Sequence, residues 1–339
     1  MVADEIAAIV ALAFIMAYAI LGGADFGSGI WSALASGPRA GQQRSALYKA
    51  IGPVWESNNV WLVGAVVVLL TMFPGAMADL FTALLVPLSV GLIGVVFRGG
   101  AFALRNYARE SGGNAVPIQG IVFSMASVIA PFAFGVALGT TASGRITLNE
   151  GGAVASGLWR PWLHALPILF GVTAVAVCAY LTMSYMTTRS SGVLREDFRM
   201  RGMLAGVAVG LLAMITLVVS YWDSRDFWDL WQRGAPLAMS GVVLLAGLAS
   251  LFVLWQRWYR LAPAATGGAM GLLVAAWGVI QFPYFIVASE RIYDVASNQA
   301  MVRASLIGLC FGALILVPSA LLLYLSFVSE SAEEAESQT

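Results

Sequence analysis

Residues 54–74 read VWESNNVWLVGAVVVLLTMFP, and this stretch decides the fold class. After a polar opening turn it continues without a charge, and a helix needs about 20 predominantly apolar residues to cross the hydrocarbon core of a membrane. Inside lipid the backbone must satisfy its own hydrogen bonds, which an α-helix does within one segment. The stretch therefore predicts a transmembrane helix, and with it an all-α polytopic membrane protein.

Apolar runs of similar length recur along the whole chain. Hydrophobic residues make up 60% of the sequence and charged residues only 11%, whereas a soluble protein carries about 25% charged residues. We predict about nine transmembrane helices from runs of the length that crosses a bilayer. The predicted spans are 6–24, 54–74, 78–97, 117–139, 162–187, 202–221, 236–255, 268–289 and 304–328.

A single integral membrane domain is expected over residues 1–339, because the loops between the runs are short. The order of the helices favours two four-helix bundles plus one further helix, with halves at 1–140 and 160–328. Basic residues concentrate in cytoplasmic loops, and the loops that contain Arg39, Arg189 and Arg257 are the more basic set. This pattern predicts an N-terminus outside the membrane and a cytoplasmic acidic tail at 329–339.

Three ionisable residues at membrane depth form one predicted group, made of Asp25, Glu56 and Arg98. A charge inside a membrane is costly and therefore indicates function. We expect Glu56 in the first turn of a helix that Pro53 opens, where the helix dipole favours a negative charge. Asp25 is expected at the inner end of the first helix, where the dipole disfavours it unless Arg98 is close. Two carboxylates with different proton affinities would suit a proton path from the cytoplasm.

The residues around Glu56 are predicted to support this path. A structural interpretation is equally open, in which Glu56 is a helix-start acid and Asp25 a partner of Arg98. Glycines near Asp25 would permit a break in the helix, or would serve helix packing. The supporting residues are Trp55, Ser57, Asn58, Asn59 and Trp61, together with Arg98.

Other kinds of site lack their usual residues. His164 is the one histidine and is predicted at the membrane interface, while Cys178 and Cys310 lie in apolar runs and are predicted to be buried. Neither a metal-binding spacing nor a nucleotide loop is present, so we expect no catalytic and no metal-binding residue. With 18 basic and 18 acidic residues, no net charge indicates nucleic acid as a partner.

Two further segments carry local predictions. Residues 221–231 are rich in tryptophan and aspartate, which favours either an aromatic belt at the membrane surface or a short helix lying in the interface. Gln281, Phe282 and Pro283 are expected to mark a kink within the eighth helix, as proline does in many membrane helices.

Residues 52–61, read with the segment around Asp25, resemble subunit II of the cytochrome bd-type ubiquinol/menaquinol oxidases. Phe73-Pro74, Pro87 and the run from Phe97 to Phe102 carry the same resemblance, which is dense over 18–109. Many members have Asp-Gly-Asn-Glu where this chain has Glu-Ser-Asn-Asn at 56–59. The first acid is thus kept and the second becomes an amide.

The resemblance implies a haem-free subunit of a quinol:dioxygen oxidoreductase in the inner membrane of a bacterium. Its partner would be a haem-bearing subunit I, with haems b and d, that oxidises quinol and reduces dioxygen to water. The family's carboxylates at Asp25 and Glu56 would begin the path for cytoplasmic protons. A small single-helix subunit and a structural quinone occur in some members.

Two other functions compete with this expectation. A secondary transporter would couple protons to a substrate through Asp25 and Glu56, and it would usually show broken helices in both halves. A purely structural membrane subunit would need neither carboxylate for turnover.

Overall fold

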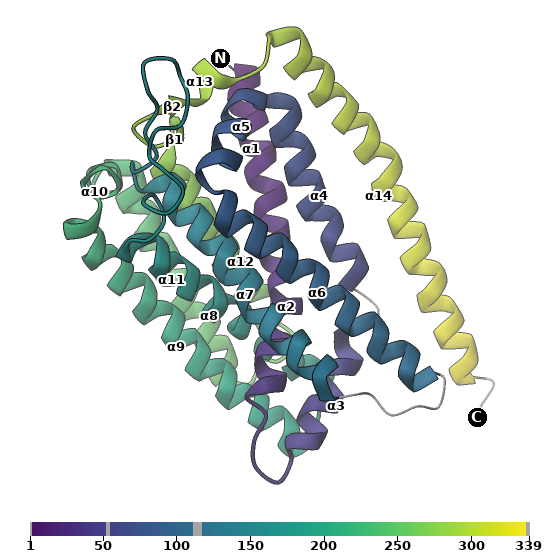
Figure 1. The fold of residues 1–339 in the computed structure, drawn as a ribbon. Coiled ribbons are helices and arrows are strands. Elements are labelled where there is room, and N and C mark those ends of the chain that lie inside the picture. The colour runs from purple at the N-terminus through teal and green to yellow at the C-terminus, as the bar shows by residue number, and fades with distance from the viewer. Residues whose placement is uncertain (1, 52–54, 111–116, 337–339) are drawn as a thin grey trace.

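Long membrane helices make up nearly all of the chain. The computed structural model describes residues 2–51, 55–110 and 117–336 (Figure 1). Within these residues seven helices are long and apolar enough to cross a membrane, or eight if a bent pair counts as one span. The predicted count of nine is therefore not confirmed. The last five unbroken spans are α7 (Pro117–Ala142), α8 (Ala165–Arg189), α9 (Gly192–Asp223), α11 (Gly234–Trp255) and α12 (Ala262–Gln281).

The ninth predicted span corresponds to α14 (Gln299–Glu336), a helix of 38 residues. Only its segment Gln299–Ile315 is classified, and it falls among the shorter apolar helices. Near its start the Ser297 backbone N–H donates to the Met72 carbonyl at 2.8 Å, and α14 packs against α1 and α4. Cys310 on this helix is exposed, so its predicted burial is wrong. The apolar run around it belongs to an outward-facing helix surface rather than to the core.

The first span differs from its prediction at both ends. It covers Val2–Ala33 as a continuous helical segment of 32 residues. Its parts are α1 (Val2–Ala17), the π-helical turn η1 (Tyr18–Gly22) and α2 (Gly23–Ala33). Asp25 thus lies in the first turn of α2 and not at the end of a helix. The glycine- and serine-rich stretch that follows Asp25 stays helical because it is buried against α7 and α8.

A sharp bend separates the next two helices, α4 (Trp55–Met72) and α5 (Pro74–Ala83), by 119°. Pro74 occupies the first turn of α5, where its missing N–H costs nothing. The third predicted span therefore begins later than expected, as α6 (Leu85–Glu110). Arg98 lies within α6, whereas the predicted span 78–97 ended just before it, so this predicted boundary is wrong. A short polar helix, α3 (Ala40–Ile51), connects α2 to α4.

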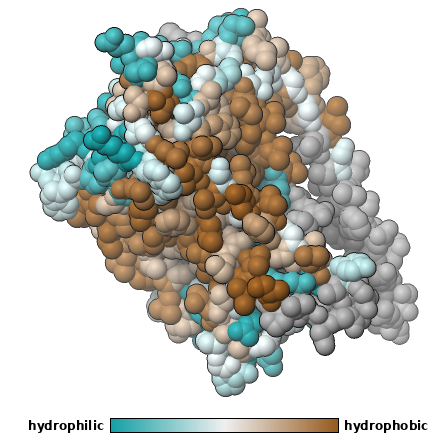
Figure 2. Space-filling model, viewed as in Figure 1, coloured by the Kyte–Doolittle hydropathy of each residue, from teal (hydrophilic) through white to brown (hydrophobic). Residues whose placement is uncertain are grey.

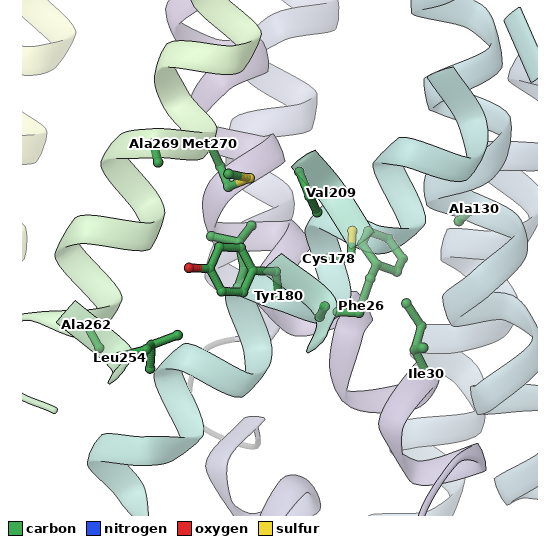
Figure 3. Packing of buried hydrophobic residues seen from close by; sticks show 13 residues of the cluster. Phe26, Ile30, Ala130, Cys178, Tyr180, Val209, Leu254, Ala262, Ala269 and Met270 are labelled. Atoms are coloured by element: carbon green, nitrogen blue, oxygen red, sulfur yellow. The ribbon is translucent and has the colours of Figure 1, made fainter. Parts of the chain in front are cut away.

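The central core joins residues that are far apart in the sequence (Figure 3). Phe26 of α2 and Ala130 of α7 belong to the same cluster as Cys178, Tyr180 and Leu254. Cys178 is buried, as predicted. The cluster thus draws on both predicted halves of the chain, and the division into halves at 1–140 and 160–328 stays a prediction.

Helix α12 ends at Gln281, so the predicted kink inside a longer helix is wrong. Phe282 has φ −59° and ψ 135°, because a residue before proline is driven out of the helical region. The chain then forms a small antiparallel pair, β1 (Tyr284–Ile286) and β2 (Glu290–Arg291), followed by α13 (Ile292–Val295).

The tryptophan-rich loop contains a short helix, α10 (Arg225–Trp231). The Ser224 hydroxyl accepts a hydrogen bond from the Phe227 N–H at 3.2 Å, which caps the helix. Phe227 and Leu230 are buried against neighbouring helices. A short helix is therefore present in this segment, while its position in the membrane interface and the aromatic belt stay predictions.

The surface separates into an apolar middle and polar ends. Figure 2 shows hydrophobic residues across the middle of the visible face and hydrophilic ones gathered toward its ends. Exposed leucines on α9 and α11 contribute to this apolar surface, among them Leu204, Leu211 and Leu245. An exposed apolar area of this extent suits contact with lipid or with a membrane partner.

Candidate functional site

The predicted acid Asp25 and the predicted base Arg98 form a buried ion pair. Arg98 Nη2 lies 2.7 Å from Asp25 Oδ1, and the two side chains are 5% and 6% exposed. The same nitrogen donates to the Asp25 backbone carbonyl at 3.1 Å, and Arg98 Nε donates to the Ser127 hydroxyl at 3.1 Å. Three helices, α2, α6 and α7, therefore meet at one guanidinium group.

Two aromatic rings flank this guanidinium. Its carbon lies 5.0 Å from the ring centre of Phe26 and 4.9 Å from that of Phe123. Such contacts stabilise a cation that has lost its water. The rings also separate the ion pair from the outside of the helix bundle, so the pair sits in an apolar enclosure where its electrostatic attraction is strong.

The backbone just before and at Asp25 accepts hydrogen bonds from several other helices. Asn58 Nδ2 on α4 donates to the Leu21 carbonyl at 3.2 Å, and the Thr182 hydroxyl on α8 donates to the Ala24 carbonyl at 2.5 Å. A π-helical turn disturbs the regular hydrogen-bond ladder, and such turns are frequent at functional sites. Donors from α4, α6 and α8 thus hold the segment 21–25 in place.

Tyr18 adds a group that the sequence analysis missed. It lies in the π-helical turn, and its hydroxyl is buried without a hydrogen-bond partner. The ring packs edge-on against Phe26 and at a steep angle to Phe134, with ring centres 6.2 Å apart in each case. An unpaired buried hydroxyl is costly. A tyrosine about two helical turns ahead of a buried acid was the signal that could have identified it.

A glycine permits the close approach of α2 to α8 at this site. A Cβ at Gly27 would clash with the Cys178 backbone carbonyl and the Thr182 hydroxyl. Gly29, two residues later, would clash in the same way with the Ser127 side chain of α7. The packing interpretation of these glycines is therefore supported, alongside the π-helical turn that precedes them.

The other predicted residues are placed less completely. Asn58 is 8% exposed, and Trp61 packs its ring 5.9 Å from that of Phe14. Asn59 is half-buried. The side chains of Trp55, Glu56 and Ser57 lie outside the described residues, although the backbone there is the start of α4. Asp25 and Arg98 are brought together, while the relation of Glu56 to Asp25 stays a prediction.

A second pair of acids lies near the N-terminal end of the bundle, and the sequence analysis did not identify it. Glu290 of β2 shares a hydrogen bond with Asp79 of α5, and its second carboxyl oxygen is buried without a partner. Burial, first, and the neighbouring Asp79 carboxyl, second, raise the pKa of Glu290 to about 7. The two acids face each other because the bend at Pro74 turns α5 toward the β-hairpin.

The one histidine, His164, lies at the start of α8 beside Asp223 of α9. The side chain of His164 is 31% exposed, and its Nδ1 lies 3.7 Å from Oδ1 of Asp223, the last residue of α9. Among the described residues no group of three metal-ligating side chains occurs. A haem usually needs axial histidine, methionine or cysteine ligands. We therefore assign no reaction step to a haem in this chain.

Known proteins are similar to this chain over most of its length. Residues 3–327 match the family described as cytochrome bd terminal oxidase subunit II. The chain is 27% identical over 319 residues to cytochrome bd ubiquinol oxidase subunit 2 of Bacillus subtilis, with 91% of this chain and 90% of that protein covered. It is 25% identical over 207 residues to the Escherichia coli K12 cytochrome bd-I ubiquinol oxidase subunit 2, covering 60% and 52% of the two chains.

A solved structure shares the fold. A chain in the structure of the bd oxidase from Geobacillus thermodenitrificans superposes with a TM-score of 0.79 at 21% identity. The match covers 96% of this chain and 99% of that one. The arrangement of helices around Asp25 and Arg98 therefore belongs to a fold that this solved oxidase also contains.

Proposed function

The chain belongs to the cytochrome bd terminal oxidase subunit II family and is therefore part of a cytochrome bd quinol oxidase complex, and we propose which share of the work it performs. It supports the haem-bearing subunit I as a scaffold. It also contributes a proton path, through Asp25 and Glu56, from the cytoplasm toward the site of dioxygen reduction. The haems b and d and the quinol site belong to subunit I in this proposal.

One observation carries the proton path, namely the burial of Asp25 with Arg98 inside the membrane helices. Replacing a buried ion pair by apolar residues often leaves a protein as stable or more stable. Stability alone therefore does not explain why the pair is present. Ionisable groups within membrane helices are functional hypotheses by default, and many belong to proton relays.

The geometry suggests how a proton could be held. Asp25 accepts from Arg98 through one carboxyl oxygen, and Arg98 also has the Ser127 hydroxyl and the Asp25 carbonyl as partners. The guanidinium can thus keep two partners while the Asp25 carboxylate takes up a proton. Asn58 donates to the carbonyl of Leu21, which lies one helical turn before Asp25. Asn58 thus connects the Asp25 segment to the start of α4, where Glu56 lies.

The proposed orientation of the chain in the membrane rests on the charged residues at the two ends of the helix bundle. Arg39, Lys49, Arg189 and Arg257 lie at the end that contains α3, while Asp4, Glu5 and Glu290 lie at the other end. By the positive-inside rule the α3 end is cytoplasmic. The N-terminus is then outside and the C-terminus inside a bacterial inner membrane. A small third subunit and a bound quinone remain part of the family expectation.

A double substitution separates a proton role from a purely structural one. Asp25→Asn alone leaves Arg98 buried without its counter-charge, which is strongly destabilising. Asp25→Asn combined with Arg98→Met removes both charges and should restore thermal stability. If the pair only holds helices together, the double variant also recovers oxygen uptake with quinol.

We expect the double variant to assemble with subunit I and to consume oxygen at least about tenfold more slowly than the wild type. Haem spectra of the purified complex report assembly, and quinol-dependent oxygen uptake reports turnover. Glu56→Gln, measured in the same assays, tests the proposed cytoplasmic entrance of the path. Full turnover in the double variant and in Glu56→Gln would assign the chain a structural role alone. With the family established, no observation favours the transporter alternative.

A further inference from the structure

A basic recess lies at the end of two membrane helices, where α11 passes into α12. Its volume is about 490 Å³, and its lining includes Arg195, Arg257 and Arg260, together with Trp258, Tyr259 and Leu261. None of the described residues that line it is acidic. Residues 256–261 separate the apolar spans Gly234–Trp255 and Ala262–Gln281. The recess therefore opens at the edge of the membrane, whichever way the chain is inserted.

The turn that forms the recess places an arginine in an unfavourable backbone position. The Trp258 N–H donates to the Val253 carbonyl at 3.1 Å and the Arg257 N–H to the Leu254 carbonyl at 3.2 Å. This pattern is a Schellman motif, whose left-handed residue is usually glycine. Arg257 occupies that position with φ 62°. A side chain retained where glycine is easier indicates that the guanidinium itself has a role.

The neighbouring acid does not neutralise the recess. Glu196 accepts from Arg199 at 2.8 Å and from Arg257 at 3.3 Å, and it also accepts from the Tyr259 hydroxyl. One carboxylate therefore serves two arginines and fixes the position of Tyr259. A surplus of positive charge remains on Arg195 and Arg260.

Arg195 is held in place and still directed to the recess. Its Nε donates to the Ser190 carbonyl at 2.5 Å, and its guanidinium carbon lies 4.9 Å from the ring centre of Tyr259. Stacking of this kind pre-orients the planar donor fork, which matches the oxygens of a phosphate group. Helix α12 begins beside the recess without a side-chain cap. The partial positive charge at its N-terminus therefore also attracts an anion.

Apolar side chains adjoin the arginines on the membrane side. Trp258 and Leu261 are 52% and 56% exposed, and Trp255 at the end of α11 is 60% exposed. Arginines with adjacent exposed tryptophan and leucine suit a ligand that has both an anionic head and hydrocarbon chains. A free phosphate ion would use the arginines alone.

We propose that this recess, formed by Arg195, Arg257 and Arg260, binds a phosphate-bearing anion, supplied by the headgroup of an anionic phospholipid. The lipid would lie with its acyl chains along Trp258 and Leu261. The recess shares no lining residue with the Asp25–Arg98 pair and its hydrogen-bond partners, so the proton path can fail while this site holds, and the reverse.

The test uses the purified oxidase complex, stripped of lipid in mild detergent and exposed to mixed micelles of phosphatidylglycerol and phosphatidylcholine. Native mass spectrometry counts the lipids that stay bound. Removal of one arginine should lower the preference for phosphatidylglycerol about fivefold, the effect of one basic residue on an anionic lipid. A second arm adds excess inorganic phosphate, which displaces phosphatidylglycerol if phosphate alone is the ligand and leaves it bound if the lipid is.

Two variants guard against simple misfolding. Arg257→Gly removes the guanidinium but relieves the left-handed backbone, so it should keep or raise thermal stability while losing phosphatidylglycerol. Arg260→Gln changes a side chain at the lining of the recess. Arg233→Gln, an exposed arginine at the opposite end of α11, is the matched control. Equal retention of phosphatidylglycerol by Arg257→Gly, Arg260→Gln and the wild type, or equal loss in Arg233→Gln, overturns the proposal.

Discussion

Two carboxyl groups of this chain, Asp25 buried and Glu290 half-buried, meet opposite partners. Asp25 faces the Arg98 guanidinium at 2.7 Å between α2 and α6, whereas Glu290 faces a second carboxyl, that of Asp79, between β2 and α5. Burial disfavours a charged carboxylate at either place. A cation beside it offsets that penalty, and a second acid adds to it.

The difference teaches that the charge of the partner, together with burial, decides what such an acid does. The Asp25 carboxylate accepts from Arg98, whose guanidinium joins α2, α6 and α7. With Asp79 beside it, Glu290 shares a proton and its charge state depends on pH. The predictions below test whether the two regions differ as much as their partners suggest.

The largest effect is expected from Arg98→Met. This change leaves the Asp25 carboxyl buried without a counter-charge, which we expect to destabilise the protein by about 3–5 kcal/mol. The measurement is the thermal inactivation of the purified complex. Arg39→Met removes the partner of Asp197 in a partly exposed ion pair and serves as control, with a far smaller effect. Similar losses in the two variants would refute the special position of Arg98.

A somewhat smaller effect is expected from Gly27→Ala, two residues beyond Asp25 and next to α8. The added methyl group forces α2 away from the Cys178 carbonyl, at a cost of about 1–3 kcal/mol for overpacking. Gly241→Ala, where no atom lies near the new methyl group, is the control. Thermal unfolding followed by circular dichroism compares the two, and a midpoint unchanged by Gly27→Ala would contradict the close packing of α2 and α8.

A third change concerns the hydrogen bonds around the π-helical turn. Asn58→Leu removes the donor to the Leu21 carbonyl and should cost about 1–2 kcal/mol, because a buried acceptor is left unpaired. The readout is again the unfolding midpoint of the complex. Thr82→Val, which removes an exposed hydroxyl bonded within its own helix, should leave the midpoint where it was. If both changes have the same effect, Asn58 does not secure the turn.

The smallest effect is expected at the second acid pair, and it depends on pH. The pKa of Glu290 is raised to about 7, so the folded protein holds a proton that the unfolded chain releases. Its contribution to stability is therefore complete below the ordinary glutamate pKa and is lost as pH rises through about 7.

Glu290→Gln should flatten this pH dependence and raise the melting temperature above pH 7 by about 1–3 °C. Asp79→Asn should shift the loss of stability to lower pH and make it smaller, since it removes the neighbouring carboxyl that helps to raise the pKa of Glu290. The exposed Asp294→Asn is the control. An identical melting profile in wild type and Glu290→Gln between pH 5 and pH 8, roughly the range where the proton is exchanged, would remove the distinction between the two acid pairs.

Sequence reasoning identified Asp25, Arg98 and Asn58 because each is a polar residue within or beside an apolar run. It could not place Asp25 correctly along its helix, since hydropathy falls in the stretch after Asp25 although the helix continues to Ala33. It overlooked Asp79 and Glu290, which are far apart in the chain and flank no motif. Their meeting depends on the bend at Pro74 and on the end of α12 at Gln281.

By itself, the sequence determined that the chain is helical and embedded in a membrane, that its polar residues concentrate near Asp25 and Glu56, and which oxidase family it resembles. These conclusions rest on hydropathy, charge and short motifs, which are properties of neighbouring residues. Only the tertiary structure decided that Asp25 pairs with Arg98, that Glu290 pairs with Asp79, and that three arginines surround one recess. The attraction or repulsion of charges depends on their distance in space and on the dielectric around them, and neither quantity is written in the order of residues.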